Sequence, residues 1–180
     1  MDRLRFATAW LGGCSGCHMS FLDLHEWLID LAARVEVVYS PIMDVKEYPQ
    51  NVDLALVEGA VANQDHLEQI RLIRQRTRIL VAFGDCAVTG NVTALRNPLG
   101  AAAPVLERAY LDGANLHPRQ PACAGIVPPL LDRVRPIHEV VPVEAHLPGC
   151  PPPAPRIRAL LEQVLAGQPP RLEGAHLRFG

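Results

Sequence analysis

The sequence predicts an α/β protein with a doubly wound, flavodoxin-like parallel sheet and a loop-rich, proline-rich C-terminal half. Three observations support this fold class. In the first half of the chain, short β-branched runs alternate with segments of helical periodicity, as they do in doubly wound sheets. Residues 79–83 are apolar throughout, which is typical of strands buried on both faces of a parallel sheet. Most of the 17 prolines lie between residues 98 and 155, where they fix the backbone and interrupt regular structure.

The first elements follow from local pattern. Residues 4–11 are mostly apolar and are expected to form the first strand. Residues 19–34 carry apolar side chains at helical spacing and predict one helix. Residues 35–39 and 52–57 are rich in valine and leucine and predict two further short strands.

The next helix has the clearest boundaries. Asn63 is a favoured N-cap residue, and Asp65 follows in the first turn, where the helix dipole favours an acidic group. Three arginines occur near the other end, which we place at about Thr77. Residues 78–83 then form the fourth predicted strand.

The second half is harder to assign. Short helices are expected near residues 104–111 and 126–134, and residues 137–143 predict a last strand. From Ile157 to Leu165 the apolar residues recur on one helical face, and Gly167 lies just beyond the expected end of that helix.

Composition limits the class of protein. We expect residues 1–180 to form a single domain. A net charge of −2 without a basic stripe argues against a nucleic-acid partner. No apolar stretch approaches the roughly 18 residues that would predict a membrane span, and the N-terminus lacks a signal-peptide pattern. We therefore expect a cytoplasmic protein.

Four of the five cysteines follow predicted strands. Cys14 and Cys17 come after the first strand, Cys86 after the fourth, and Cys150 beyond the last. Parallel strands end at the same edge of a sheet, so these cysteines are expected to converge there. Each has a glycine one or two residues before it, which permits sharp turns. Four thiolates on turns are the ligand set of a cubane iron–sulfur cluster, one [4Fe-4S] per chain.

Three nearby residues have open roles. Glu58 ends the third strand and either caps backbone amides or acts as a buried carboxylate beside the cluster. His18 either donates to a cluster sulfur or faces solvent from the first turn of its helix. Cys123 has no strand to bring it to the cluster edge, so we interpret it as a small buried hydrophobic residue.

Two other kinds of site remain open on residue pattern alone. A C-x-x-C between a strand and a helix also occurs in thioredoxin-like thiol–disulfide oxidoreductases. A structural zinc module also uses four cysteines, although usually as two close pairs, whereas here one pair accompanies two distant single cysteines.

The cysteine segments together resemble the small subunit of nickel–iron hydrogenases, a family related to the cluster-bearing quinone-site subunit of respiratory complex I. The resemblance covers most of the chain, in the family's order. The matching segments are Gly12-Gly13-Cys14-Ser15-Gly16-Cys17, Glu58-Gly59, Gly84-Asp85-Cys86-Ala87 and Pro148-Gly149-Cys150-Pro151. The complex I subunit typically has two adjacent cysteines at the first ligand position, so the spaced pair favours the hydrogenase branch over a complex I-like quinone oxidoreductase subunit.

In length the chain is similar to the short small subunit of cytoplasmic, NAD-linked bidirectional hydrogenases, so no second cluster domain is expected. The resemblance implies an electron-transfer subunit that is not catalytic alone. A large subunit would hold the nickel–iron centre and cleave hydrogen. A diaphorase module with iron–sulfur clusters and flavin would reduce NAD+, and the cluster on this chain would relay electrons between the two.

One family feature is missing. Many members have a glutamate two residues after the second cysteine, and this chain has Met19 there, so that glutamate's role cannot be transferred. The flavodoxin-like fold also raises the possibility of a bound flavin, but the sequence has no phosphate-binding loop apart from the cysteine motif.

Overall fold

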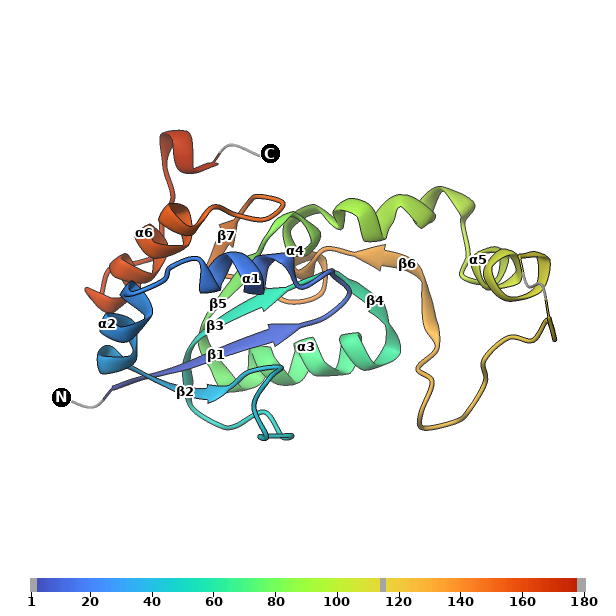
Figure 1. Cartoon of the computed structure of the whole chain (residues 1–180), viewed down its shortest axis with the longest axis horizontal. Helices are drawn as coiled ribbons and strands as arrows, with labels where there is room; N and C mark the ends of the chain where they lie inside the picture. Colours follow the sequence, from blue (N-terminus) through green and yellow to red (C-terminus); the bar gives the residue numbers. More distant parts are fainter. Residues whose placement is uncertain (1–2, 114–115, 178–180) are drawn as a thin grey trace.

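The computed structural model describes residues 3–113 and 116–177 and has a parallel sheet at its centre (Figure 1). All neighbouring strands in this sheet are parallel, in the order β2-β1-β3-β5-β7. This is the flavodoxin-like order, and it confirms the predicted fold class. The five strands are β1 (Leu4–Trp10), β2 (Val35–Tyr39), β3 (Val52–Glu58), β5 (Thr77–Phe83) and β7 (Ala145–Leu147).

Helices cover both faces of the sheet (Figure 1). On one face, Ile70 and Ile73 of α3 (Gln64–Arg76) pack into a core with the alternate side chains of β1, β3 and β5. A second core on the opposite face contains side chains from three helices: α1 (Gly16–Leu22), α2 (Trp27–Arg34) and α6 (Ala154–Leu165). The middle strands are therefore buried from both sides, which explains their continuous apolar runs.

Helix α3 forms as its sequence predicts. The Asn63 side-chain oxygen accepts a hydrogen bond from the His66 backbone amide at 2.8 Å, which satisfies one of the free amides at the helix start. The expected end is also confirmed, because α3 stops at Arg76 and Thr77 opens β5. The predicted final helix is confirmed as α6.

The single helix predicted over residues 19–34 is wrong, because two helices cover this segment. Between α1 and α2 the chain makes tight turns, and His25 adopts a positive φ of 49°. Leu24 lies in the break and is buried against the sheet with Leu31. The apolar spacing thus reflects one buried face that continues across the break, and it does not distinguish one helix from two.

A short antiparallel ribbon stands beside the main sheet. It pairs β4 (Val61–Asn63) with β6 (Leu130–Arg135), so the helix predicted over residues 126–134 is wrong. Pro128 and Pro129 precede β6, and proline disfavours helical backbone in the residue before it. The pairing with β4 then fixes the extended backbone.

The strand predicted over residues 137–143 is also wrong. A 3-10 turn, η3 (Ile137–Glu139), begins this segment, and the last strand of the sheet comes later as β7. Ile137 and Val141 are buried on the face of the sheet that packs against α3. Their apolar character serves packing on the sheet rather than pairing within it, since Pro142 removes a backbone donor.

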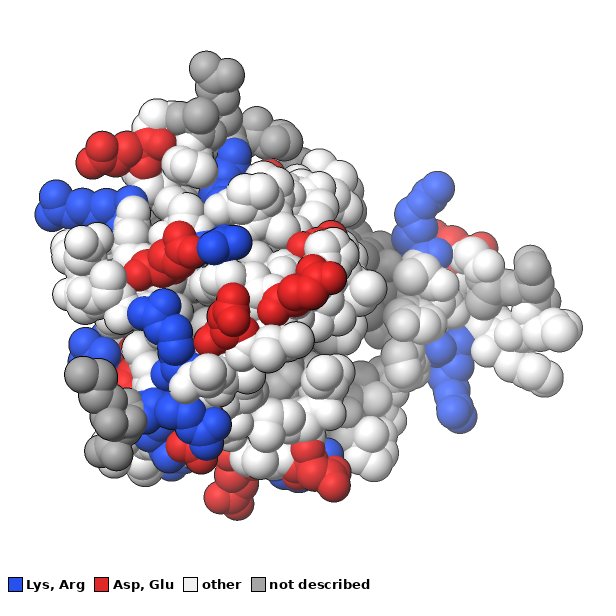
Figure 2. Space-filling view, turned by 60° about the vertical axis from the view of Figure 1, so that its left-hand side comes forward, with Lys and Arg blue, Asp and Glu red and all other residues white. Residues whose placement is uncertain are grey.

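The described part of the segment between β5 and β6 contains four short helical elements, the last two of which lie on a projecting arm. Helix α4 (Asp85–Thr89) is followed by the 3-10 helix η1 (Asn91–Leu99), and then by α5 (Ala103–Glu107) and η2 (Arg108–Asp112), which confirm the helix expected near residues 104–111. The part beyond η1 extends away from the body (Figures 1 and 2). No helix among the described residues is long and apolar enough to cross a membrane. The described part of the chain ends with the 3-10 turn η4 (Gly174–Leu177).

Candidate functional site

Four cysteines from distant parts of the sequence meet in one pocket of about 60 Å³, which we call the cysteine pocket. They follow β1, β5 and β7, and because these strands are parallel their carboxyl ends open at the same edge of the sheet. The predicted convergence is therefore confirmed. The pocket is lined by Cys14, Gly16, Cys17, Glu58, Asp85, Cys86, Gly149, Cys150 and Pro151.

Two of the cysteine loops are hydrogen-bonded to each other. The Asp85 backbone amide donates to the Gly149 carbonyl at 2.9 Å, and the Gly149 amide donates to Asp85 Oδ1 at 2.6 Å. These bonds fix the start of α4, which carries Cys86, against the loop that carries Cys150. Asp85 thus joins two segments that are 64 residues apart in the sequence.

Glycine is required where the backbone passes a cysteine sulfur. A Cβ atom at Gly84 would lie 2.2 Å from Cys17 Sγ, far inside contact distance. Gly84 also has a φ of 84° and a ψ of 164°, a region that is essentially restricted to glycine. A Cβ at Gly16 would lie 3.3 Å from Cys14 Sγ. The pocket therefore depends on backbone that carries no side chain.

Burial differs among the pocket cysteines. Cys17 is buried, Cys86 is half-buried, and Cys14 and Cys150 are exposed. Burial raises the pKa of the Cys17 thiol, and the nearby Glu58 carboxylate and the other three thiols raise it further. Burial and the neighbouring thiols also raise the pKa of Cys86. A buried thiol with a raised pKa is a poor attacking group, so Cys17 itself is not suited to be the nucleophile of a thiol–disulfide exchange.

Glu58 is a buried carboxylate with defined partners. Its side chain is 2% exposed, and Oε2 accepts a hydrogen bond from the His18 backbone amide at 3.0 Å. The same oxygen lies 2.5 Å from His18 Nδ1. Glu58 therefore caps an amide at the start of α1, which is one of the two roles expected from sequence.

His18 adopts neither of the two positions expected from sequence. Its ring is 19% exposed, so the solvent-facing position is wrong. Nδ1 faces Glu58 rather than a cysteine sulfur, and Nε2 is buried without a hydrogen-bond partner among the described residues. His18 thus contacts Glu58, which lines the cysteine pocket, and its own side chain lines a second cavity described below.

The donor set fits a cluster better than a single ion. Among the described residues, no three His, Cys, Asp or Glu side chains are grouped as ligands of one metal ion. A zinc ion draws its four ligands to one point, with Zn–S distances of about 2.3 Å. In a [4Fe-4S] cluster each thiolate binds a different iron, so the four sulfurs surround a volume. The pocket cysteines line a shared volume of about 60 Å³, which is compatible with the second kind of group.

The fifth cysteine does not belong to this group. Cys123 lies on the projecting arm and does not line the cysteine pocket, as expected from the lack of a strand leading to it. It is exposed, so our interpretation of a buried hydrophobic residue is wrong. No residue in the described part of the arm belongs to either buried core. Sequence reasoning also missed Asn91, whose Nδ2 donates to Cys150 Sγ at 3.3 Å.

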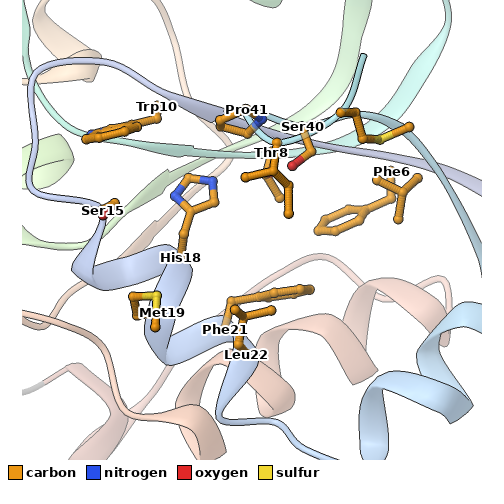
Figure 3. A pocket seen from close by; sticks show the side chains of 13 residues that line it. Phe6, Thr8, Trp10, Ser15, His18, Met19, Phe21, Leu22, Ser40 and Pro41 are labelled. Atoms are coloured by element: carbon orange, nitrogen blue, oxygen red, sulfur yellow. The ribbon is translucent and has the colours of Figure 1, made fainter. Parts of the chain in front are cut away.

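A second, apolar cavity adjoins the site, which we call the apolar groove (Figure 3). It has a volume of about 560 Å³ and lies between α1, the end of β1 and the loop after β2. Figure 3 shows Phe6 and Trp10 on one side and the His18 ring rising from α1 between them. Large apolar side chains at its rim stay exposed, including Met19 at 61% and Ile42 at 90%. Such a surface marks an interaction site.

Fold and site together define a class: an α/β subunit that presents four thiols at the carboxyl edge of a flavodoxin-like sheet. The family model described as NADH ubiquinone oxidoreductase, 20 Kd subunit, matches residues 14–164, which include all four pocket cysteines. The chain belongs to this family.

Similar relatives in the family are hydrogenase subunits. The chain is 34% identical to the NAD-reducing hydrogenase HoxS subunit delta of Cupriavidus necator, over 93% of this chain and 81% of the relative. It is 39% identical to a subunit of the F420-non-reducing hydrogenase vhu of Methanococcus voltae, over 95% of this chain but only 59% of the relative. A chain in the crystal structure of an NAD+-reducing [NiFe]-hydrogenase has 40% identity and a TM-score of 0.93, with 99% and 100% of the two chains covered. The resemblance to a hydrogenase small subunit is thereby confirmed.

Proposed function

We propose that this chain is the electron-transfer small subunit of an NAD-reducing nickel–iron hydrogenase. The observation that carries the proposal is the convergence of four cysteines in one pocket, in a chain that superposes along its whole length on a chain of an NAD+-reducing [NiFe]-hydrogenase. The chain spans about 59% of the Methanococcus voltae relative and 81% of the NAD-reducing relative.

The pocket cysteines are the proposed ligands of one [4Fe-4S] cluster: Cys14, Cys17, Cys86 and Cys150. When bound, such a cluster supplies a one-electron carrier whose potential depends on burial and on hydrogen bonds to its sulfurs. The chain's own part is to hold the four thiolates in place. Gly84 and Gly16 leave the necessary space, and the Asp85–Gly149 hydrogen bonds fix two ligand loops to each other.

The proposed partners are a large subunit with the nickel–iron centre and a diaphorase module with flavin and further clusters. Cys14 and Cys150 are exposed in this chain, so a partner must cover them to exclude water from the cluster. The apolar groove lies beside this edge and gives a large subunit apolar surface to bury. The chain alone has no group that activates hydrogen, so it should neither oxidise hydrogen nor reduce NAD+ by itself.

Anaerobic purification of the native complex tests the proposal. We expect about four irons and four sulfides in this chain, the content of one [4Fe-4S] cluster, and a paramagnetic signal in the reduced state. A large subunit with nickel should co-purify, together with diaphorase subunits. Hydrogen-dependent dye reduction by the isolated chain would refute the relay role, and a native complex without a diaphorase would refute the NAD-linked part alone. A colourless chain with one zinc would refute the cluster.

A further inference from the structure

Asn91 lies immediately beside the last of the proposed cluster ligands. It opens η1, two residues beyond the end of α4, and its side-chain Nδ2 donates a hydrogen bond to Cys150 Sγ at 3.3 Å. The two residues are 59 positions apart in the sequence. The contact therefore depends on how η1 lies against the loop after β7, and no local sequence pattern predicts it.

The backbone at Asn91 provides a second, independent observation. Its φ is 39°, in the left-handed region that few residues other than glycine adopt, and asparagine is among those that tolerate it. Gly90 before it also has a positive φ, of 86°. The backbone amide of Asn91 donates to Thr89 Oγ1 at 3.3 Å, which helps to hold this turn. An unusual backbone conformation is thus maintained where it directs an amide at a cysteine sulfur.

A hydrogen bond to a thiolate has a definite electrostatic consequence. The N–H dipole points its positive end toward the sulfur and stabilises additional negative charge there. A cluster gains one negative charge on reduction, so a donor to a ligand sulfur favours the reduced form more than the oxidised form. Hydrogen bonds to the sulfurs are accordingly among the factors that set cluster potentials.

We infer that Asn91 is a positioning residue that raises the reduction potential of the cluster held by Cys150. This inference rests on the proposed function, because it requires Cys150 to be a cluster ligand. Asn91 acts through the sulfur and contacts no substrate. Replacing Asn91 should therefore change the reduction potential of the cluster and leave its iron and sulfide content unchanged.

Two variants of the complete, anaerobically purified complex test this role. Asn91→Gly removes the amide and tolerates the positive φ, and Asn91→Asp keeps the shape but replaces the donor with a carboxylate. The matched control is Asn51→Gly. Asn51 also has a positive φ, of 57°, but lies at the amino end of β3, away from the cysteine pocket. Iron and sulfide content and the midpoint potential, from a redox titration followed by electron paramagnetic resonance, are the readouts.

We expect full iron and sulfide content in all three variants. In both Asn91 variants the ratio of reduced to oxidised cluster at a fixed potential should fall about tenfold, which equals about 59 mV for a one-electron couple. Asn51→Gly should leave the potential unchanged. Equal potentials in Asn91→Gly and the control would overturn the inference and leave the proposed function intact. Loss of iron from both Asn91 variants would also overturn the inference, because Asn91 would then be needed to hold the cluster. Absence of a [4Fe-4S] signal from the wild-type complex would instead overturn the proposed function, and the inference with it.

Discussion

Replacing Gly84 with alanine should damage the cysteine pocket more than any comparable glycine substitution on the surface. The new Cβ would lie 2.2 Å from Cys17 Sγ and 3.6 Å from Cys17 Cβ, so the cysteine side chain would have to move. The backbone conformation, with φ at 84° and ψ at 164°, also disfavours any side chain. The clash acts on Cys17 in α1, and the backbone strain acts at the start of α4, which carries Cys86.

The cost can be worked out from these two effects. An unfavourable backbone region costs about 1–3 kcal/mol, and an overpacked buried contact costs about 1–3 kcal/mol more. The sum of about 2–6 kcal/mol is a large part of the roughly 5–15 kcal/mol that keeps a domain folded. Gly100→Ala is the matched control, because Gly100 has a similar φ of 80° but nothing within 4 Å of the added Cβ. Its expected cost is only that of its own left-handed backbone conformation, about 1–2 kcal/mol.

The assay is anaerobic unfolding by denaturant, followed by circular dichroism, together with iron and sulfide analysis of each purified variant. Gly84→Ala should unfold at lower denaturant than Gly100→Ala and should contain less iron. If the two variants were equally stable and Gly84→Ala kept a full complement of iron and sulfide, the steric argument for the pocket would be wrong. A serine at the same position should behave like alanine, because the clash arises at Cβ.

Three further predictions follow from the same structure. Serine in place of any one of the pocket cysteines should remove or convert the cluster, whereas Cys123→Ser should leave the visible spectrum unchanged; normal iron and sulfide in two or more pocket variants would contradict the ligand assignment. Burial lowers the pKa of His66 in the folded chain, so the unfolded chain binds the proton more readily and stability should decline as pH falls through about 6.5. His66→Gln should flatten that decline in unfolding measurements made from pH 8 to 5, and an unchanged slope would refute it. Hydrogen exchange in the proline-rich segments 98–104 and 148–155 should slow when the large subunit binds, and equal exchange in the free and bound chain would exclude them from the interface.

Local pattern was a sound guide wherever an element's own residues decide its conformation. The Asn63 cap and the late arginines of α3 are local signals, and the helix has the predicted ends. The strands at the centre of the sheet are apolar because both faces are covered, so their sequences identify them directly. The convergence of the cysteines followed from the strand order alone, since parallel strands end at one edge.

Local pattern misled where a distant partner decides the conformation. Residues 130–135 form a strand because β4 pairs with them, and their own sequence does not predict that pairing. Residues 137–143 are apolar because they pack on the sheet, and apolar character alone does not separate packing from pairing. The break between α1 and α2 leaves the buried face uninterrupted, so helical periodicity continues across it.

The sequence by itself determined which side chains the site contains: four cysteines that follow glycines and strands, in the chain order of a hydrogenase small subunit. Only the tertiary structure decided what surrounds those sulfurs. Glu58 meets His18 across 40 residues, Asp85 meets Gly149 across 64, and the Asn91 amide reaches Cys150 across 59. The physical reason is that ligand identity depends on residue type, which is written in the chain. Hydrogen bonds between loops depend on distances of about 3 Å, which packing alone sets.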